Sequence, residues 1–112
     1  MTKEIITILT LSKGRLKTQA EQVFKKNKLK IIQKSERSLI GSIKDYPSVR
    51  VMYMNASEIL EALGKGIGDI GISGKDLWRE SEPSIQSKIS LAKEYNWGKS
   101  DLVVAVDTAW LD

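Results

Sequence analysis

Two segments of the sequence combine small residues with charged or polar ones in a way that suits an anionic ligand. The first, Leu11 to Arg15, lies between an apolar run and an amphipathic one. Glycine at Gly14 lets a ligand approach the backbone, helix N-terminal amides attract anions, and Lys13 and Arg15 add positive charge. Because a cation there opposes the helix dipole, this placement is unfavourable unless an anion binds. The alternative is a surface turn whose cations are simply solvated.

The second segment covers residues 68–76 and is rich in glycine. Its small residues Gly71, Ser73 and Gly74 would open the carboxyl end of a strand, where ligands bind in open α/β sheets. The alternative is that these residues serve packing alone. Asp69 either belongs to the same site or caps a strand end. The first segment does not have the glycine and lysine spacing of a P-loop.

The elements that must position these residues follow from hydrophobic periodicity. Residues 4–10 are short, β-branched and apolar, which predicts a buried strand. Apolar residues at helical spacing predict a helix over 15–27, and candidate N-caps at Asn55 and Ser57 predict another that ends near Gly64. A third helix is expected at 75–80, a turn at 45–48, and further strands at 29–33, 38–43, 49–54, 69–73, 87–94 and 101–106. This order predicts an α/β fold with a mixed β-sheet flanked by helices.

Length and composition favour a single globular domain over residues 1–112. The chain has 41% apolar and 29% charged residues, which is ordinary for a folded protein. No apolar run approaches the ~20 residues that span a bilayer, and the start lacks the pattern of a secretory signal, so we expect a cytoplasmic protein. The sequence contains no cysteine and no histidine. Disulfides, thiolate zinc sites and histidine-based triads are therefore excluded.

The positive charge is concentrated in one half of the chain. Residues 1–50 carry twelve Lys or Arg against four Asp or Glu, whereas residues 51–112 carry six against ten. A basic half suggests a polyanionic partner, such as nucleic acid or a phosphorylated small molecule. Against nucleic acid, the basic residues are not interleaved with aromatic ones and no recognised motif is present. For Lys25, Lys26 and Lys28, the alternative is a solvated helix face.

Several short motifs, taken in order along the chain, resemble the ATP phosphoribosyltransferase family. They are Lys13-Gly14-Arg15-Leu16 after an apolar strand, Asn55-Ala56-Ser57-Glu58-Ile59, then Asp69-Ile70-Gly71-Ile72-Ser73-Gly74-Lys75-Asp76, and finally Tyr95-Asn96-Trp97-Gly98 with Asp101 to Val106. Each motif is modest by itself, but their succession is specific and covers nearly the whole chain. Two positions depart from the family pattern: Trp97 stands where Phe is usual, and Asp107 stands where Pro is common.

The resemblance implies one lobe of a two-lobed, periplasmic-binding-protein-like type II fold. It also implies a glycosyltransferase of histidine biosynthesis that condenses ATP with phosphoribosyl pyrophosphate to N1-phosphoribosyl-ATP and pyrophosphate. Magnesium would be bound mainly with the substrate and the second lobe. Attack of adenine N1 on the ribose anomeric carbon requires alignment and charge stabilisation more than a nucleophilic side chain. The lack of histidine and cysteine is therefore no obstacle.

The resemblance further implies a set of substrate-binding residues at the matching positions. Lys13 and Arg15 would contact substrate phosphate or base, Arg37 would line the same cleft, and the facing loops would supply backbone and hydroxyl donors. Trp78 and Trp110 are interpreted as packing residues, and no catalytic side chain or metal ligand is assigned. The full set is Lys13, Gly14, Arg15, Arg37, Asn55, Ala56, Ser57, Asp69, Ser73 and Gly74.

The sequence lacks the acidic, Gly-Thr-rich loop that holds phosphoribosyl pyrophosphate in the family. We therefore expect the 112-residue chain to bind adenine nucleotide weakly and not to turn over by itself. A full-length enzyme would be a homo-oligomer, or a hetero-oligomer with a regulatory subunit resembling histidyl-tRNA synthetase; Ser57-Glu58-Ile59 favours this short form. No nucleic-acid or membrane partner is expected. The alternative function is a non-catalytic small-anion-binding module of periplasmic-binding-protein type, against which the lack of an export signal counts.

Overall fold

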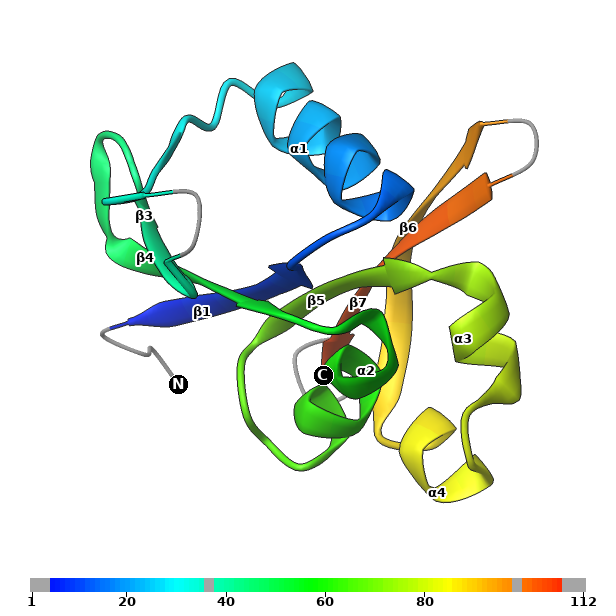
Figure 1. Cartoon of the computed structure of the whole chain (residues 1–112). Coiled ribbons are helices and arrows are strands. Elements are labelled where there is room, and N and C mark those ends of the chain that lie inside the picture. Colours follow the sequence, from blue (N-terminus) through cyan, green and yellow to red (C-terminus); the bar gives the residue numbers. More distant parts are fainter. Residues whose placement is uncertain (1–4, 36–37, 98–99, 108–112) are drawn as a thin grey trace.

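The computed structural model describes residues 5–35, 38–97 and 100–107. Within these residues, strands and helices alternate along most of the chain (Figure 1). The strands are β1 (Ile6–Leu11), β2 (Ile31–Ile32), β3 (Ile40–Ile43), β4 (Tyr46–Met54), β5 (Ile70–Gly74), β6 (Ile89–Trp97) and β7 (Ser100–Asp107). The helices are α1 (Arg15–Lys26), α2 (Ala56–Gly64), α3 (Lys75–Glu80) and α4 (Pro83–Gln86).

The strands of the described part form one seven-stranded sheet in the order β2-β3-β4-β1-β5-β7-β6. The three central strands β4, β1 and β5 are parallel to one another, and the flanking pairs are antiparallel. Parallel neighbours require a crossover connection, and α1 and α2 lie in the connections between these strands. The predicted α/β class with a mixed sheet flanked by helices is confirmed, and the arrangement is consistent with a periplasmic-binding-protein-like lobe.

Helices α1 and α2 cover opposite faces of the sheet, as their contacts with β5 show. A Cβ on Gly74 would lie 3.3 Å from Leu16 of α1, whereas a Cβ on Gly71 would lie 3.0 Å from Ile59 of α2. Residues three apart in a strand point to opposite faces, so the two helices sandwich the sheet. Each helix buries the apolar stripe that its sequence predicts: Ala20, Val23 and Phe24 in α1, and Ile59, Leu60 and Leu63 in α2.

The hairpin between β3 and β4 is tighter than the sequence suggested. We expected a turn at residues 45–48, but Ile43 already pairs with Tyr46, and the turn consists of Lys44 and Asp45. Asp45 adopts a left-handed conformation with φ 70°, which aspartate tolerates better than most residues. Strand β4 can therefore begin at Tyr46. The short helix α4, with its proline in the first turn, was not predicted.

At the β2–β3 end of the sheet, apolar side chains are left exposed on one face. On the face that α2 covers elsewhere, Ile32 and Ile40 remain 48% and 57% exposed. Together with Ile5, Leu39 and Arg50 they line an open hollow of about 920 Å³. The covered core lies instead around β1, whose residues Leu9 and Leu11 are almost fully buried. The strand that precedes the first candidate segment is thus deeply anchored in the core.

Candidate functional site

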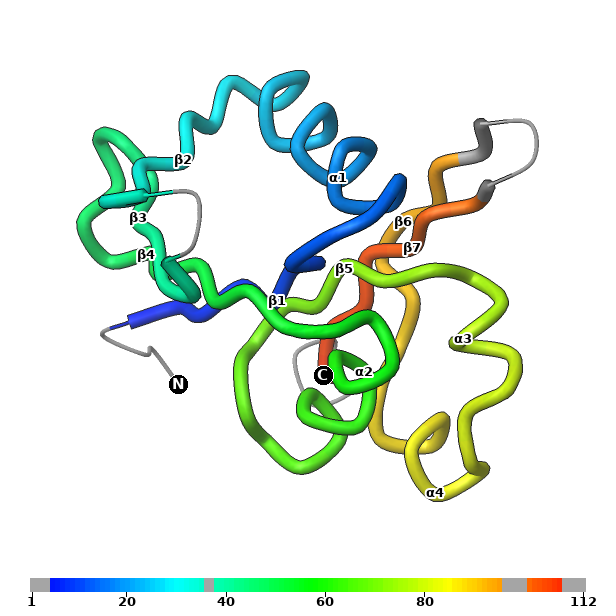
Figure 2. The backbone as a smooth tube through the Cα atoms, in the orientation of Figure 1, coloured from blue at the N-terminus to red at the C-terminus, as the bar shows by residue number. Residues whose placement is uncertain are grey.

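The three parallel strands bring three chain segments to one edge of the sheet. Because β4, β1 and β5 are parallel, their carboxyl ends share an edge, and the chain leaves all three on that side (Figure 2). The segment after β1 contains Lys13, Gly14 and Arg15, and the segment after β4 contains Asn55, Ala56 and Ser57. The third segment is the end of β5 itself, at Ser73 and Gly74.

The segment after β1 is an exposed, positively charged start of a helix. Gly14 occupies the N-cap of α1 with φ 87° and ψ −175°, a backbone conformation that is essentially restricted to glycine. The first turn of α1 contains no acidic residue, and Lys13 and Arg15 are both exposed. The helix dipole therefore meets cations rather than the anions that stabilise this end. Such an arrangement is stabilised when an anion binds.

The segment after β4 begins α2 and has its own polar contacts. Asn55 is the N-cap of α2, but its side chain forms no bond to the helix backbone. Its Nδ2 instead donates to Oε1 of Glu58 at 3.0 Å. Asn55 and Ser57 are exposed, and this helix start lies at the same edge of the sheet as the segment of Lys13. The junction is tied to β1 because the N–H of Ser12 donates to the carbonyl of Met54 at 3.0 Å.

The end of β5 joins the other two segments but lies inside the fold. Ser73 is fully buried, and its Oγ lies 3.5 Å from the carbonyl oxygen of Ala56 at the start of α2. Gly74 packs against Leu16 in the first turn of α1. We expected Ser73 to offer its hydroxyl to a ligand; in the structure this hydroxyl faces α2. The end of β5 thus contacts the start of α1 on one face of the sheet and the start of α2 on the other.

Asp69, a member of the expected set, stands apart from this edge. Asp69 immediately precedes β5 and so lies at the opposite edge of the sheet from Ser73 and Gly74. It is 3% exposed, and its carboxylate accepts the backbone N–H of Thr7. Of the two interpretations of Asp69, the cap at a strand end is the one that fits this geometry. Arg37 lies outside the described residues, as does Trp110; Trp78 is partly buried against the core, as expected of a packing residue.

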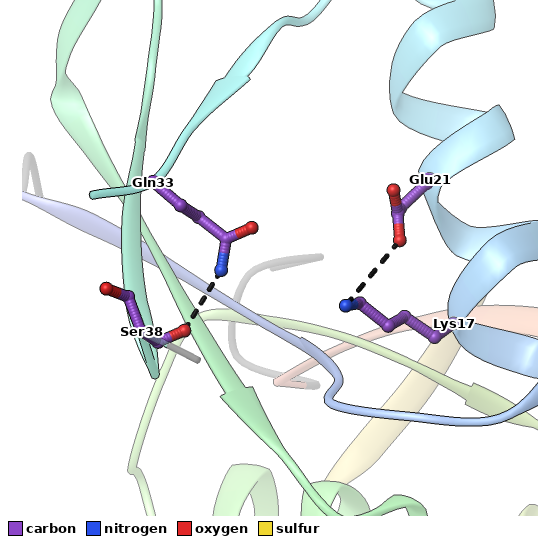
Figure 3. A network of polar contacts seen from close by, with 4 residues as sticks. All are labelled: Lys17, Glu21, Gln33 and Ser38. Carbon is purple, nitrogen blue, oxygen red and sulfur yellow. Dashed lines mark hydrogen bonds and ion pairs between the residues drawn. The ribbon is translucent and has the colours of Figure 1, made fainter. Parts of the chain in front are cut away.

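Lys17, Glu21 and Tyr53 form a cluster beside the site that the sequence reasoning missed. The Nζ of Lys17 lies 3.9 Å from Oε1 of Glu21 (Figure 3). The same Nζ lies 5.7 Å from the ring centroid of Tyr53. Burial raises the pKa of Tyr53, and the negative charge of Glu21 raises it further. The i, i+4 spacing of Lys17 and Glu21 was visible in the sequence, but their approach to Tyr53 depends on the packing of α1 on β4.

Lys75, the residue that follows Gly74, is neutralised by a partner. Its Nζ lies 2.9 Å from Oε2 of Glu94 on β6, and both side chains are partly exposed. Among the described residues, no group of three or more Asp, Glu, His or Cys side chains could hold a metal ion. Within the same ranges, no helix combines the length and apolar character needed to cross a bilayer.

The sequence comparisons converge on one group of proteins, although no protein-family model matches the chain. An ATP phosphoribosyltransferase of Sinorhizobium fredii (strain NBRC 101917 / NGR234) is 36% identical over 108 residues, which cover 96% of this chain and 47% of that protein. The ATP phosphoribosyltransferase of Agrobacterium fabrum (strain C58 / ATCC 33970) is 37% identical over 109 residues, with the same coverage. The chain thus spans about half the length of these curated relatives.

A solved structure shares the fold. It is described as the ATP phosphoribosyl transferase (HisG:HisZ) complex from Thermotoga maritima, and it aligns with a TM-score of 0.59 over 83% of this chain and 41% of that one. At 19% sequence identity this similarity concerns the fold alone. It agrees with the mixed sheet and flanking helices described above.

Proposed function

We propose that this chain forms the first lobe of an ATP phosphoribosyltransferase, because it is 36% identical to one such enzyme along 96% of its length. The whole enzyme would act in histidine biosynthesis, condensing ATP with phosphoribosyl pyrophosphate to N1-phosphoribosyl-ATP and pyrophosphate. This chain covers 47% of the relatives' length. The lobe that binds phosphoribosyl pyrophosphate would correspond to sequence that this chain does not span.

The observation that supports this role is the meeting of three segments at the carboxyl edge of β4, β1 and β5. Lys13 and Arg15 are exposed there, at a helix start without acidic residues, and suit the phosphates of ATP. Gly14 allows a phosphate to approach the backbone, and Asn55 to Ser57 offer amide and hydroxyl donors from the adjacent helix start. Ser73 and Gly74 would act indirectly, by packing the end of β5 against the start of α2 on one face and the start of α1 on the other.

In the proposed reaction, the bond between adenine N1 and the ribose anomeric carbon forms while the bond from that carbon to pyrophosphate breaks. The leaving pyrophosphate takes the bonding electrons, so negative charge moves onto its oxygen. The contribution of this chain would be to hold the triphosphate and so to orient the adenine ring. Alignment of this kind supplies a large part of the rate enhancement in reactions without a nucleophilic side chain.

Magnesium would enter with the substrate. The described residues offer no cluster of three acidic side chains, and magnesium in phosphoryl-type sites is often held through substrate phosphates and water. No step is therefore assigned to a metal on this chain. We also propose a cytoplasmic location and oligomerisation, either with further copies or with a regulatory subunit. The structural neighbour from Thermotoga maritima is described as a HisG:HisZ complex.

The test has two parts. First, formation of phosphoribosyl-ATP is measured with this chain and, as a positive control, with the full-length Sinorhizobium fredii relative. We expect activity in the relative alone, and turnover by the 112-residue chain would contradict the assignment to one incomplete lobe.

Second, ATP binding to this chain is followed by NMR chemical shifts in wild type, Lys13→Gln and Arg15→Gln. The matched control is Lys88→Gln, an exposed cation just before β6 at the opposite edge of the sheet. We expect each of the first two variants to weaken binding about tenfold, as for loss of a charge-assisted hydrogen bond, and the control to bind normally. Equal affinity for ATP and for inorganic phosphate would instead favour the small-anion-binding module.

A further inference from the structure

Lys17 lies between the first two segments of the candidate site. It is the third residue of α1, two positions after Arg15, and its ammonium group lies over the ring of Tyr53 at 5.7 Å. Tyr53 is the penultimate residue of β4 and pairs with Thr10 of β1. The charge of Lys17 is therefore held over the carboxyl ends of the two strands that lead into the site.

The ion pair of Lys17 is the loosest of those found in the described residues. Its Nζ lies 3.9 Å from Glu21, at the limit of an ion pair, whereas Lys65 lies 3.0 Å from Glu61 and Lys75 lies 2.9 Å from Glu94. The side chain of Lys17 is only 25% exposed, while that of Glu21 is 54% exposed. Lys17 thus has a mostly covered side chain whose charge is only weakly compensated by Glu21.

The neighbouring charges increase this imbalance. Lys13, Arg15 and Lys17 lie within five consecutive residues, and the first turn of α1 contains no acid. Each of the three opposes the helix dipole. A bound polyphosphate would compensate all three, whereas Glu21, one turn further along the helix, compensates Lys17 alone and at long distance.

We propose that Lys17 is a third phosphate-binding cation of this site, and that Glu21 competes with the substrate phosphate for it. In the free protein Lys17 rests near Glu21 and over Tyr53; on binding, its Nζ leaves Glu21 and contacts a phosphate oxygen. Glu21 thereby lowers the affinity for polyphosphate and selects ligands with enough charge to displace it. This inference rests on the proposed function, because it assumes that a polyphosphate binds at this edge.

The experiment compares Lys17→Gln and Glu21→Gln in the complete 112-residue chain. Dissociation constants for ATP, for tripolyphosphate and for adenosine are measured by NMR titration. We expect Lys17→Gln to lower the affinity for both phosphorylated ligands about tenfold, and Glu21→Gln to raise it roughly threefold. Adenosine, which carries no phosphate, should bind equally to all variants. Lys17→Arg, which keeps the charge, should restore most of the affinity for tripolyphosphate.

Matched controls come from the second i, i+4 pair, Glu61 near the end of α2 and Lys65 at its C-cap. Lys65→Gln and Glu61→Gln make the same changes in net charge at the end of α2 that lies away from the site. If Lys17→Gln behaves like Lys65→Gln, the inference is overturned and Lys17 is a solvated helix residue. If Glu21→Gln weakens binding, the competing role of Glu21 is wrong. Thermal unfolding midpoints verify that each variant is folded.

The two proposals fail in different ways. Loss of ATP binding in Lys13→Gln and Arg15→Gln, with normal binding in Lys17→Gln, would leave the proposed function standing and remove the role of Lys17. Absence of any binding of ATP and tripolyphosphate to the wild-type chain would overturn the proposed site, and the role of Lys17 would fall with it.

Discussion

The carboxylate of Asp69 accepts a hydrogen bond from the backbone N–H of Thr7, with Oδ2 2.8 Å from the nitrogen. In return, the backbone N–H of Asp69 donates to the carbonyl of Thr7, also at 2.8 Å. These two bonds fasten the start of β5 to β1, at the edge opposite the candidate site. An acidic residue within a glycine-rich motif thus has a structural explanation that involves no ligand.

Replacing Asp69 by Ala should destabilise the fold without altering the affinity for ATP. The N–H of Thr7 would lose its acceptor in a buried position, which costs on the order of 1–3 kcal/mol. Asp69→Asn keeps one carbonyl oxygen and should cost less. Urea unfolding measures the stability, and NMR titration measures the affinity of the folded fraction. Full stability combined with weaker ATP binding would show that Asp69 acts at the site.

Gly68→Ala should be far more destabilising than Gly66→Ala. Both glycines have φ 85°, so either substitution strains the backbone by about 1–2 kcal/mol. A Cβ on Gly68 would in addition lie 2.6 Å from Cγ of Leu9, whereas a Cβ on Gly66 would meet no atom within 4 Å. The difference between the two unfolding free energies, measured by urea denaturation, isolates the clash with Leu9. Equal losses would mean that Leu9 moves aside freely.

Leu9→Ala should cost about 2–5 kcal/mol, and Leu39→Ala should change stability by no more than about 0.5 kcal/mol. Leu9 is fully buried in β1, whereas Leu39 is 64% exposed beside the open sheet face. The two substitutions remove the same atoms, so their comparison reports burial alone. The measurement is the shift of the urea midpoint at constant m-value. A large loss in Leu39→Ala would indicate that this face is covered in solution.

Stability should fall more steeply above pH 10 in the wild type than in Tyr53→Phe. The pKa of Tyr53 in the folded protein is raised above its usual value of 10.0, first by burial and then by Glu21. The unfolded chain therefore loses the phenolic proton at lower pH than the folded protein does. The stabilising contribution of neutral Tyr53 is complete below the unfolded pKa and is lost as the pH rises through the folded pKa.

Urea unfolding between pH 9 and pH 11 checks this expectation, since subtracting the Tyr53→Phe profile removes the titration of other groups. In the Glu21→Gln variant, the pKa of Tyr53 in the folded protein should be lower than in the wild type, because one of the two causes of the shift is gone. The decline of stability with pH should therefore be shallower in this variant than in the wild type. Identical pH profiles for wild type and Tyr53→Phe would contradict the raised pKa.

Much of the secondary structure was predictable because it depends on neighbours along the chain. Helix α1 was expected over 15–27 and runs from Arg15 to Lys26, with its apolar stripe buried. The hairpin was misplaced because its turn depends on Asp45 adopting a positive φ, which the Pro47 signal obscured. Strand β2 was expected over 29–33 but covers only Ile31–Ile32, because these are the residues that pair with β3.

By itself, the sequence determined the alternation of strands and helices, the basic segment around Gly14 and the family resemblance, because all of these reside in local order and spacing. Only the tertiary structure decided which members of the motifs meet. Ser73 and Asp69 are four residues apart, yet they lie at opposite edges, because a strand advances ~3.3 Å per residue. Lys17 and Tyr53 are far apart in sequence but in contact, because the parallel pairing of β1 with β4 carries α1 over β4.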